Sequence, residues 1–302
     1  MSGGRSSDGW LVAIPVVFVL IWSTGFIVAR YGMPHAPPLS FLALRYALSM
    51  ACFLAWIGWA KVAWPQSREQ WLHLSVTGVL MHAAYLGGVW VAVKAGMGSG
   101  LSSLVVGFQP VLTAIWLAYR TRGSDQPGIS QRQWLGLLLG FVGLLMVVWR
   151  KLSLGTPLDH VTPANMAFAL AALLSITVGT LYQKRFVKAC DVRSANTVQL
   201  LAALVVTLPF AWMETEAMRW NGELAGAMAW SVLGLTVGGS SLLYMMIQRG
   251  AAASVTSLMY LVPPTTAMMA WLLFDEPITW ATLLGTVLTA LGVSWVVRPS
   301  RR

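Results

Sequence analysis

The chain has 302 residues, of which 57% are hydrophobic and only 10% are charged. Because an average soluble domain has about 25% charged residues, this composition excludes an ordinary water-soluble domain and favours a chain solvated by lipid. A net charge of +10 could indicate a nucleic-acid partner. We expect none, because the Lys and Arg residues stand at the ends of apolar stretches, where membrane topology places them.

Ten stretches are long and apolar enough to cross a bilayer, which takes about 17–25 residues of helix. The first follows a basic residue as a signal peptide does, but it is too long and lacks a small-residue cleavage site, so we interpret it as an uncleaved helix. Only Arg45 places a charge inside a stretch. The sequence therefore predicts an all-α integral membrane protein with ten transmembrane helices. In chain order the stretches are Trp10–Ala29, Pro38–Ala60, Gln70–Val93, Met97–Tyr119, Gln133–Trp149, Pro163–Gln183, Ser194–Met213, Leu224–Gln248, Gly250–Phe274 and Ile278–Val297.

The basic residues also predict an orientation. If the N-terminus lies inside, fourteen of the 20 Lys and Arg residues fall on the inner side and five on the outer side. Short loops rich in Lys and Arg stay in the cytoplasm, so we expect a multi-pass protein of the bacterial inner (plasma) membrane with both termini cytoplasmic.

An internal repeat divides the chain into residues 10–149 and residues 163–297. An offset of 154 residues aligns the first four helices of the two halves, and an offset of 149 aligns the fifth helices. Because five is an odd number, the second copy is expected to lie upside down relative to the first, as in the inverted repeats of secondary transporters. The identical pairs are Gly25 and Gly179, Ser40 and Ser194, Gly96 and Gly250, Leu104 and Leu258, Pro110 and Pro264, Gly136 and Gly285, and Gly143 and Gly292.

The sequence resembles the drug/metabolite transporter superfamily, in its EamA-type branch. The resemblance implies ten helices in a five-plus-five repeat and transport of small metabolites. One departure is that Arg122 occupies the place equivalent to Glu276, where the family often has a second Glu. The residues that carry the resemblance are Trp22-Ser23-Thr24-Gly25-Phe26, Arg45, Gln109-Pro110, Pro263-Pro264, Glu276, Gly285 and Gly292.

Polar and helix-breaking residues gather near the middle of several stretches. Secondary transporters bind substrate near the bilayer midplane, beside interrupted helices whose backbone groups are freed. The alternative is that the prolines only bend helices and the small residues only let helices pack. We predict no catalytic residues and assign the following residues to substrate binding: Trp22, Ser23, Thr24, His82, Tyr85, Gln109, Thr177, Ser240, Tyr244 and Pro263.

Arg45 has three alternative roles. It could bind an anionic group such as a carboxylate, extend outward to water, or donate to helix-end carbonyls. Because the family resemblance places Arg here for different substrates, the structural roles are favoured. No Asp or Glu lies well inside a stretch, so movement is expected to be uncoupled, by exchange, or coupled through another group such as His82.

The function predicted from these features is a secondary transporter, an exporter of a small organic metabolite such as an amino acid, working by alternating access. The alternative is an intramembrane enzyme acting on a lipid-soluble substrate, which would need a polar cluster where only isolated residues such as His82 and His160 occur. The expected partners are that small-molecule substrate and membrane lipids. The glycines of the fifth and tenth helices either join the two halves or form a homodimer face. Cys52 and Cys190 have no partners at ligand or disulfide spacing, so neither metal nor cofactor is expected.

Overall fold

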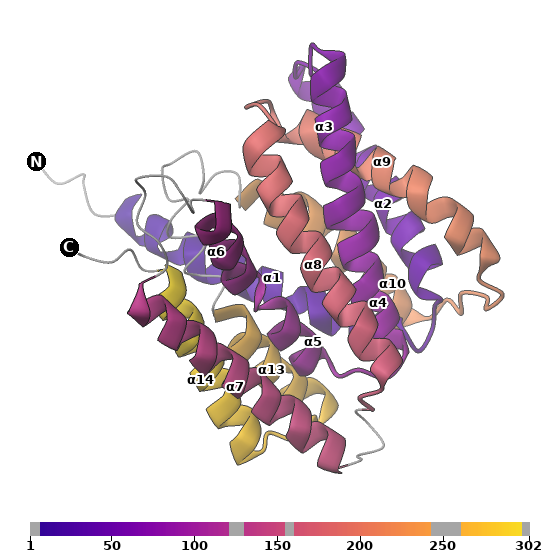
Figure 1. Cartoon of the computed structure of the whole chain (residues 1–302). Helices are drawn as coiled ribbons and strands as arrows, with labels where there is room; N and C mark the ends of the chain where they lie inside the picture. The colour runs from indigo at the N-terminus through magenta and orange to yellow at the C-terminus, as the bar shows by residue number, and fades with distance from the viewer. Residues whose placement is uncertain (1–6, 121–129, 155–159, 243–260, 298–302) are drawn as a thin grey trace, which may run out of the picture.

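The computed structural model describes residues 7–120, 130–154, 160–242 and 261–297, and every regular element in these ranges is helical (Figure 1). Tyr244, Gly250, Leu258 and Arg122 lie outside the described residues. The elements are α1 (Ser7–Gly32), α2 (Pro38–Ala60), α3 (Arg68–Gly78), η1 (Val79–Ala84), α4 (Tyr85–Lys94), α5 (Ser99–Val106), α6 (Gln109–Arg120), α7 (Gln131–Leu154), α8 (Pro163–Phe186), α9 (Val192–Met213), α10 (Gly222–Ala229), η2 (Trp230–Gly239), α13 (Val262–Phe274) and α14 (Trp280–Val297).

Each of the ten predicted stretches contains at least one described helix. The third stretch is one rod made of α3, the π-helix η1 and α4, and the fourth is broken into α5 and α6. Four rods are long and apolar enough to cross a membrane by themselves: Pro38–Ala60, Arg68–Lys94, Pro163–Phe186 and Val192–Met213. Shorter apolar helices in α1, α7, α13 and α14 accompany them. The chain is therefore a multi-pass membrane protein.

Local signals set the helix starts. Thr162 and Asn165 form a reciprocal capping box at the start of α8. Asp191 accepts from the backbone N–H of Arg193 at 2.9 Å and so caps α9. The side chain of Arg193 also donates to the Asp191 carboxylate, at 2.8 and 2.9 Å, and these bonds hold the pKa of Asp191 below its ordinary value.

Side chains from distant elements tie together one end of the bundle, which we call the capped end. Glu214, just after α9, accepts from the N–H groups of Leu39 and Ser40 at 3.0 and 2.7 Å and thereby caps α2. Glu276, just after α13, accepts from the N–H of Ser99 at 3.1 Å and caps α5. The other links of this end are Lys94 with Glu216, Asn165 with the carbonyl of Ala95, and His35 with Glu223. The starts of α2, α5, α8 and α10 and the ends of α1, α4, α9 and α13 therefore meet on one side.

Glycines let helices of the two halves touch. In Figure 1, α7 and α14 run side by side. A Cβ built on Gly143 would lie 2.5 Å from the carbonyl oxygen of Gly285, and one on Gly292 would lie 2.5 Å from the N of Gly140. Of the two uses predicted for these glycines, joining the halves is the one that the structure contains. The homodimer stays a prediction.

Candidate functional site

Helix α1 carries three of the predicted site residues into the bundle. Ser23 is fully buried, and its Oγ has no hydrogen-bond partner in the part of the chain that the structure describes. Its carbonyl accepts from Thr266 Oγ1 of α13 at 3.3 Å. Thr24 Oγ1 accepts from Trp230 Nε1 of η2 at 2.7 Å. Trp22 is half-buried and packs against a large cluster of buried apolar side chains that includes Phe41 and Trp90. Residues of α1 thus contact two rods of the second half.

The third rod changes helical form at His82. In η1 the backbone N–H of Tyr85 faces the carbonyl of Leu80, five residues back, which is the wider π-helical spacing. The carbonyl of His82 accepts from the hydroxyl of Tyr46 on α2 at 2.8 Å, and the two rings meet edge to face with centroids 6.1 Å apart. π-Helical turns inside α-helices often mark functional sites. His82 and Tyr85 therefore lie together at a distorted segment, and Tyr46, which the sequence analysis missed, joins them.

The rod of α10 and η2 has a second π-helix. Thr236 Oγ1 donates to the carbonyl of Ser231 at 2.9 Å, five residues back. The same oxygen accepts from Nε and Nη2 of Arg45, both at 3.2 Å. Arg45 lies on α2 beside Tyr46, so neighbouring residues of α2 reach the two π-helices. Gly239, at the end of η2, faces Trp22 of α1, and Ser240 is half-buried directly after it.

The predicted break of the fourth rod is present. α5 ends at Val106 and α6 starts at Gln109, with a turn between them. Gln109 Nε2 donates to Thr180 Oγ1 of α8 at 2.8 Å. Thr177 is buried, but its hydroxyl donates at 2.6 Å to the carbonyl of Leu173 in its own helix. The assignment of Thr177 to substrate binding stays a prediction, and it is Thr180 that joins α8 to Gln109.

Pro263 packs against the broken fourth rod. It is buried near the start of α13, and a Cβ built on Gly107 would lie 2.7 Å from Pro263 Cγ. Gly107 therefore permits close packing between the broken fourth rod and α13. Tyr244 lies outside the described residues, so its assignment stays a prediction.

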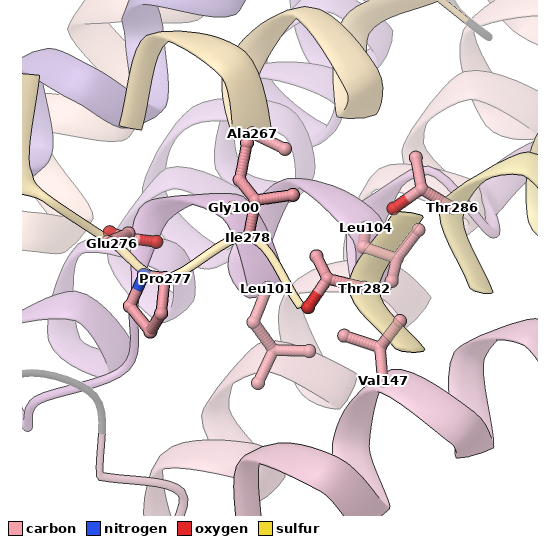
Figure 2. Close-up of a pocket in the computed structure, with 10 residues that line it drawn as sticks. All are labelled: Gly100, Leu101, Leu104, Val147, Ala267, Glu276, Pro277, Ile278, Thr282 and Thr286. Atoms are coloured by element: carbon pink, nitrogen blue, oxygen red, sulfur yellow. The ribbon is translucent and has the colours of Figure 1, made fainter. Parts of the chain in front are cut away.

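A small cavity at the capped end is separate from these residues. Its volume is about 20 Å³, which is enough for about one water molecule. Figure 2 shows Glu276 and Pro277 at one side of it and Thr282 and Thr286 at the other. The cavity is too small for an organic metabolite. Among the described residues, no group of three or more His, Cys, Asp and Glu side chains could hold a metal ion.

The packed apolar rods and the polar side chains buried among them define a multi-pass membrane protein. The chain belongs to the EamA-like transporter family, because the sequence model of that family matches residues 9–149 and again residues 164–298.

Several relatives span nearly the whole chain. A probable amino-acid metabolite efflux pump of Escherichia coli is 26% identical over 297 residues, which cover 95% of this chain and 93% of the relative. The protein of the same description from Salmonella typhimurium is 25% identical over 95% of this chain and 93% of its own. An uncharacterized transporter of Archaeoglobus fulgidus is 24% identical over 91% of this chain and 93% of its own.

A solved structure agrees with the fold. One crystal structure superposes with a TM-score of 0.66 at 17% identity, covering 94% of this chain and 95% of the other. At that identity the likeness concerns the fold alone.

Proposed function

We propose that this protein is a secondary transporter that exports a small organic metabolite, such as an amino acid, across the inner membrane by alternating access between two inverted five-helix halves. The relatives described as amino-acid metabolite efflux pumps support the direction and the solute class. The observation that carries the mechanism is a set of contacts between the halves that recurs under the internal repeat.

The central contacts recur at the offset of 154 residues. Arg45 of the first half contacts Thr236 of the second. Their counterparts at this offset are Gln199 and His82, which lie on α9 and η1, and these two elements pack against each other. The two π-helices also correspond, because η1 moved by 154 residues falls within η2. Two crossed contacts of this kind are expected when one half is a rotated copy of the other.

The contact between the fifth and tenth helices recurs at the other offset. Gly143 faces Gly285, while Gly292 faces the carbonyl of Gly136. At an offset of 149 residues Gly143 corresponds to Gly292 and Gly136 corresponds to Gly285, so the two contacts are equivalent. The family model, which matches each half separately, supports the same division.

Two halves arranged in this way can open a central site first to one side of the membrane and then to the other. With the N-terminus inside, the capped end faces outward, and the links that Glu214 and Glu276 make there between distant helices would close that side. The π-helices at mid-rod have weaker, wider backbone hydrogen bonding and are suitable places for the rods to bend. The substrate would lie between them, beside His82, Tyr85 and the break before Gln109.

The driving force is proposed to be exchange or the solute gradient itself. Each Asp and Glu within the described helices lies in a first turn, and the other acids of the described residues lie beyond helix ends. The described spans therefore contain no carboxylate relay. His82 is the residue through which a proton would be coupled if one is needed.

Efflux from liposomes tests the proposal. Purified protein would be reconstituted into liposomes loaded with each of the common L-amino acids, with and without a pH gradient, beside protein-free liposomes. We expect faster efflux of one or a few amino acids, slower efflux for Gln109→Ala, and unchanged efflux for Gln66→Ala, an exposed residue outside the spans. Efflux no faster than from protein-free liposomes for the whole panel would overturn the proposal. Strict dependence on the pH gradient would overturn the uncoupled driving force alone.

A further inference from the structure

Arg45 is a charged side chain in the interior of the bundle. It stands seven residues after Pro38, so it lies about 10 Å along α2 from the capped end, at about 1.5 Å per residue. It is only 7% exposed, which shows that its guanidinium does not extend to the membrane surface. Within the described chain it donates to no helix-end carbonyl, because both of its hydrogen bonds go to the hydroxyl oxygen of Thr236. Two of the three alternative roles, extension outward to water and donation to helix-end carbonyls, are therefore absent from the described structure.

The charge of Arg45 is not balanced by an acid. No Asp or Glu of the described residues forms an ion pair with it. Glu69, Glu214, Glu216 and Glu223 have other partners at the ends of helices. A buried charge is costly unless it is paired, and a neutral hydroxyl shared by two donors pairs it poorly. Further N–H donors of the guanidinium fork remain for another acceptor.

Two neutral side chains that can donate lie one turn away from Arg45 and from Thr236, each in the same helix. Ser49 follows one turn later on α2, and Ser231 precedes Thr236 by one π-helical turn on η2. Both serines are fully buried, and their hydroxyls have no partner among the residues that the structure describes. Buried polar groups are nearly always bonded, so unpartnered ones indicate a missing water or ligand. An excess of donors around a cation favours an anionic ligand.

We propose that Arg45 binds a carboxylate of the transported solute. This inference rests on the proposed function and narrows it to solutes that carry a carboxylate. Arginine suits the task because its planar fork donates two parallel hydrogen bonds to the two carboxylate oxygens. The site spans both halves, since Arg45 belongs to the first half and Thr236 to the second. A carboxylate that takes over donors now directed at Thr236 would loosen the contact between α2 and η2 and so couple binding to the movement of the halves.

Amides of the transported amino acids test the carboxylate in the unaltered protein. Proteoliposomes would be loaded with each common L-amino acid or with its C-terminal amide, which keeps the side chain and the ammonium group but lacks the negative charge. Hydrogen bonds to charged groups predict that the amide is moved about ten- to a hundredfold more slowly. Equal rates for acid and amide would overturn the carboxylate inference and leave the transporter proposal intact. If neither is moved, both proposals fail.

Variants then assign the effect to Arg45. We expect Arg45→Met to slow efflux of the amino acid at least tenfold but to leave the slow amide rate unchanged, and Arg45→Lys to recover part of the loss. Arg68→Met, at an exposed position at the start of α3, is the matched control and should behave as wild type. Thermal unfolding would show which variants are folded. If Arg45→Met does not fold, the comparison of acid and amide in the unaltered protein decides whether a carboxylate is recognised. A folded Arg45→Met protein with wild-type efflux and acid-over-amide preference would assign the carboxylate to another residue and overturn the inference.

Discussion

Replacing Gly143 with alanine would place a methyl group in the contact between α7 and α14. The new Cβ would lie 2.5 Å from the carbonyl oxygen of Gly285, and 2.7 and 2.9 Å from Oγ1 and N of Thr289. Two of these three atoms belong to the backbone of α14, so the helices must separate. Overpacking of this kind costs about 1–3 kcal/mol. Alanine also favours a helix over glycine by about 1 kcal/mol, which offsets part of that cost.

A second glycine isolates the contact from the helix propensity. Gly58 lies inside α2, and a Cβ built on it has no atom within 4 Å. Gly58→Ala therefore gains the higher helix propensity of alanine without a steric clash between helices. Reversible unfolding in mixed detergent micelles would measure the free energy of unfolding of both variants. We expect Gly143→Ala to be less stable than Gly58→Ala by about 1–3 kcal/mol. Equal values would refute the close packing of α7 on α14.

Two helix caps give further predictions. Glu276→Ala leaves the N–H and the hydroxyl of Ser99 without their acceptor and should lower the free energy of unfolding by about 1–2 kcal/mol. Glu69→Ala, at an exposed position, is the control and should change the free energy of unfolding little. Unfolding curves that give similar small losses for both variants would refute the cap. Asp191→Ala removes the cap of α9 and should cost about 1 kcal/mol at neutral pH. Because the folded-state pKa of Asp191 is lowered, its contribution is full above the ordinary value of 3.8 and is lost as the pH falls through the folded-state pKa. Thermal unfolding of both proteins from neutral pH down to about pH 3 should therefore show the difference shrinking, and a constant difference would contradict it.

Hydrophobicity made the rods predictable. Each of the ten stretches contains a described helix, because a run of apolar residues long enough to cross lipid has few alternatives to a helix. The break before Gln109 could be anticipated from Pro110, since proline removes a backbone donor. The glycines of α7 and α14 indicated close packing, although their spacing alone did not identify the partner helix.

The long-range contacts and the π-helices were not predictable from the sequence. The π-helices η1 and η2 leave no mark in a hydropathy pattern, because they change the backbone spacing by one residue within an apolar rod. The contact of Arg45 with Thr236 joins residues 191 positions apart. Glu276 reads as a loop acid in the sequence, and only the packing of α13 against α5 makes it a helix cap. The sequence pointed to the region of Thr177, whereas the partner of Gln109 is a residue three positions later.

Alternating access can be measured directly at two equivalent buried positions. Ser23 and Thr177 are 154 residues apart and both buried. Each would be changed to cysteine, as Ser23→Cys and Thr177→Cys, in a chain whose Cys52 and Cys190 are replaced by serine. A membrane-impermeant thiol reagent would then be added to the outer or the inner side. We predict labelling of each cysteine from both sides, with a transported amino acid shifting the balance. Labelling from one side only, or no labelling with and without the amino acid, would contradict two halves that open a shared centre in turn.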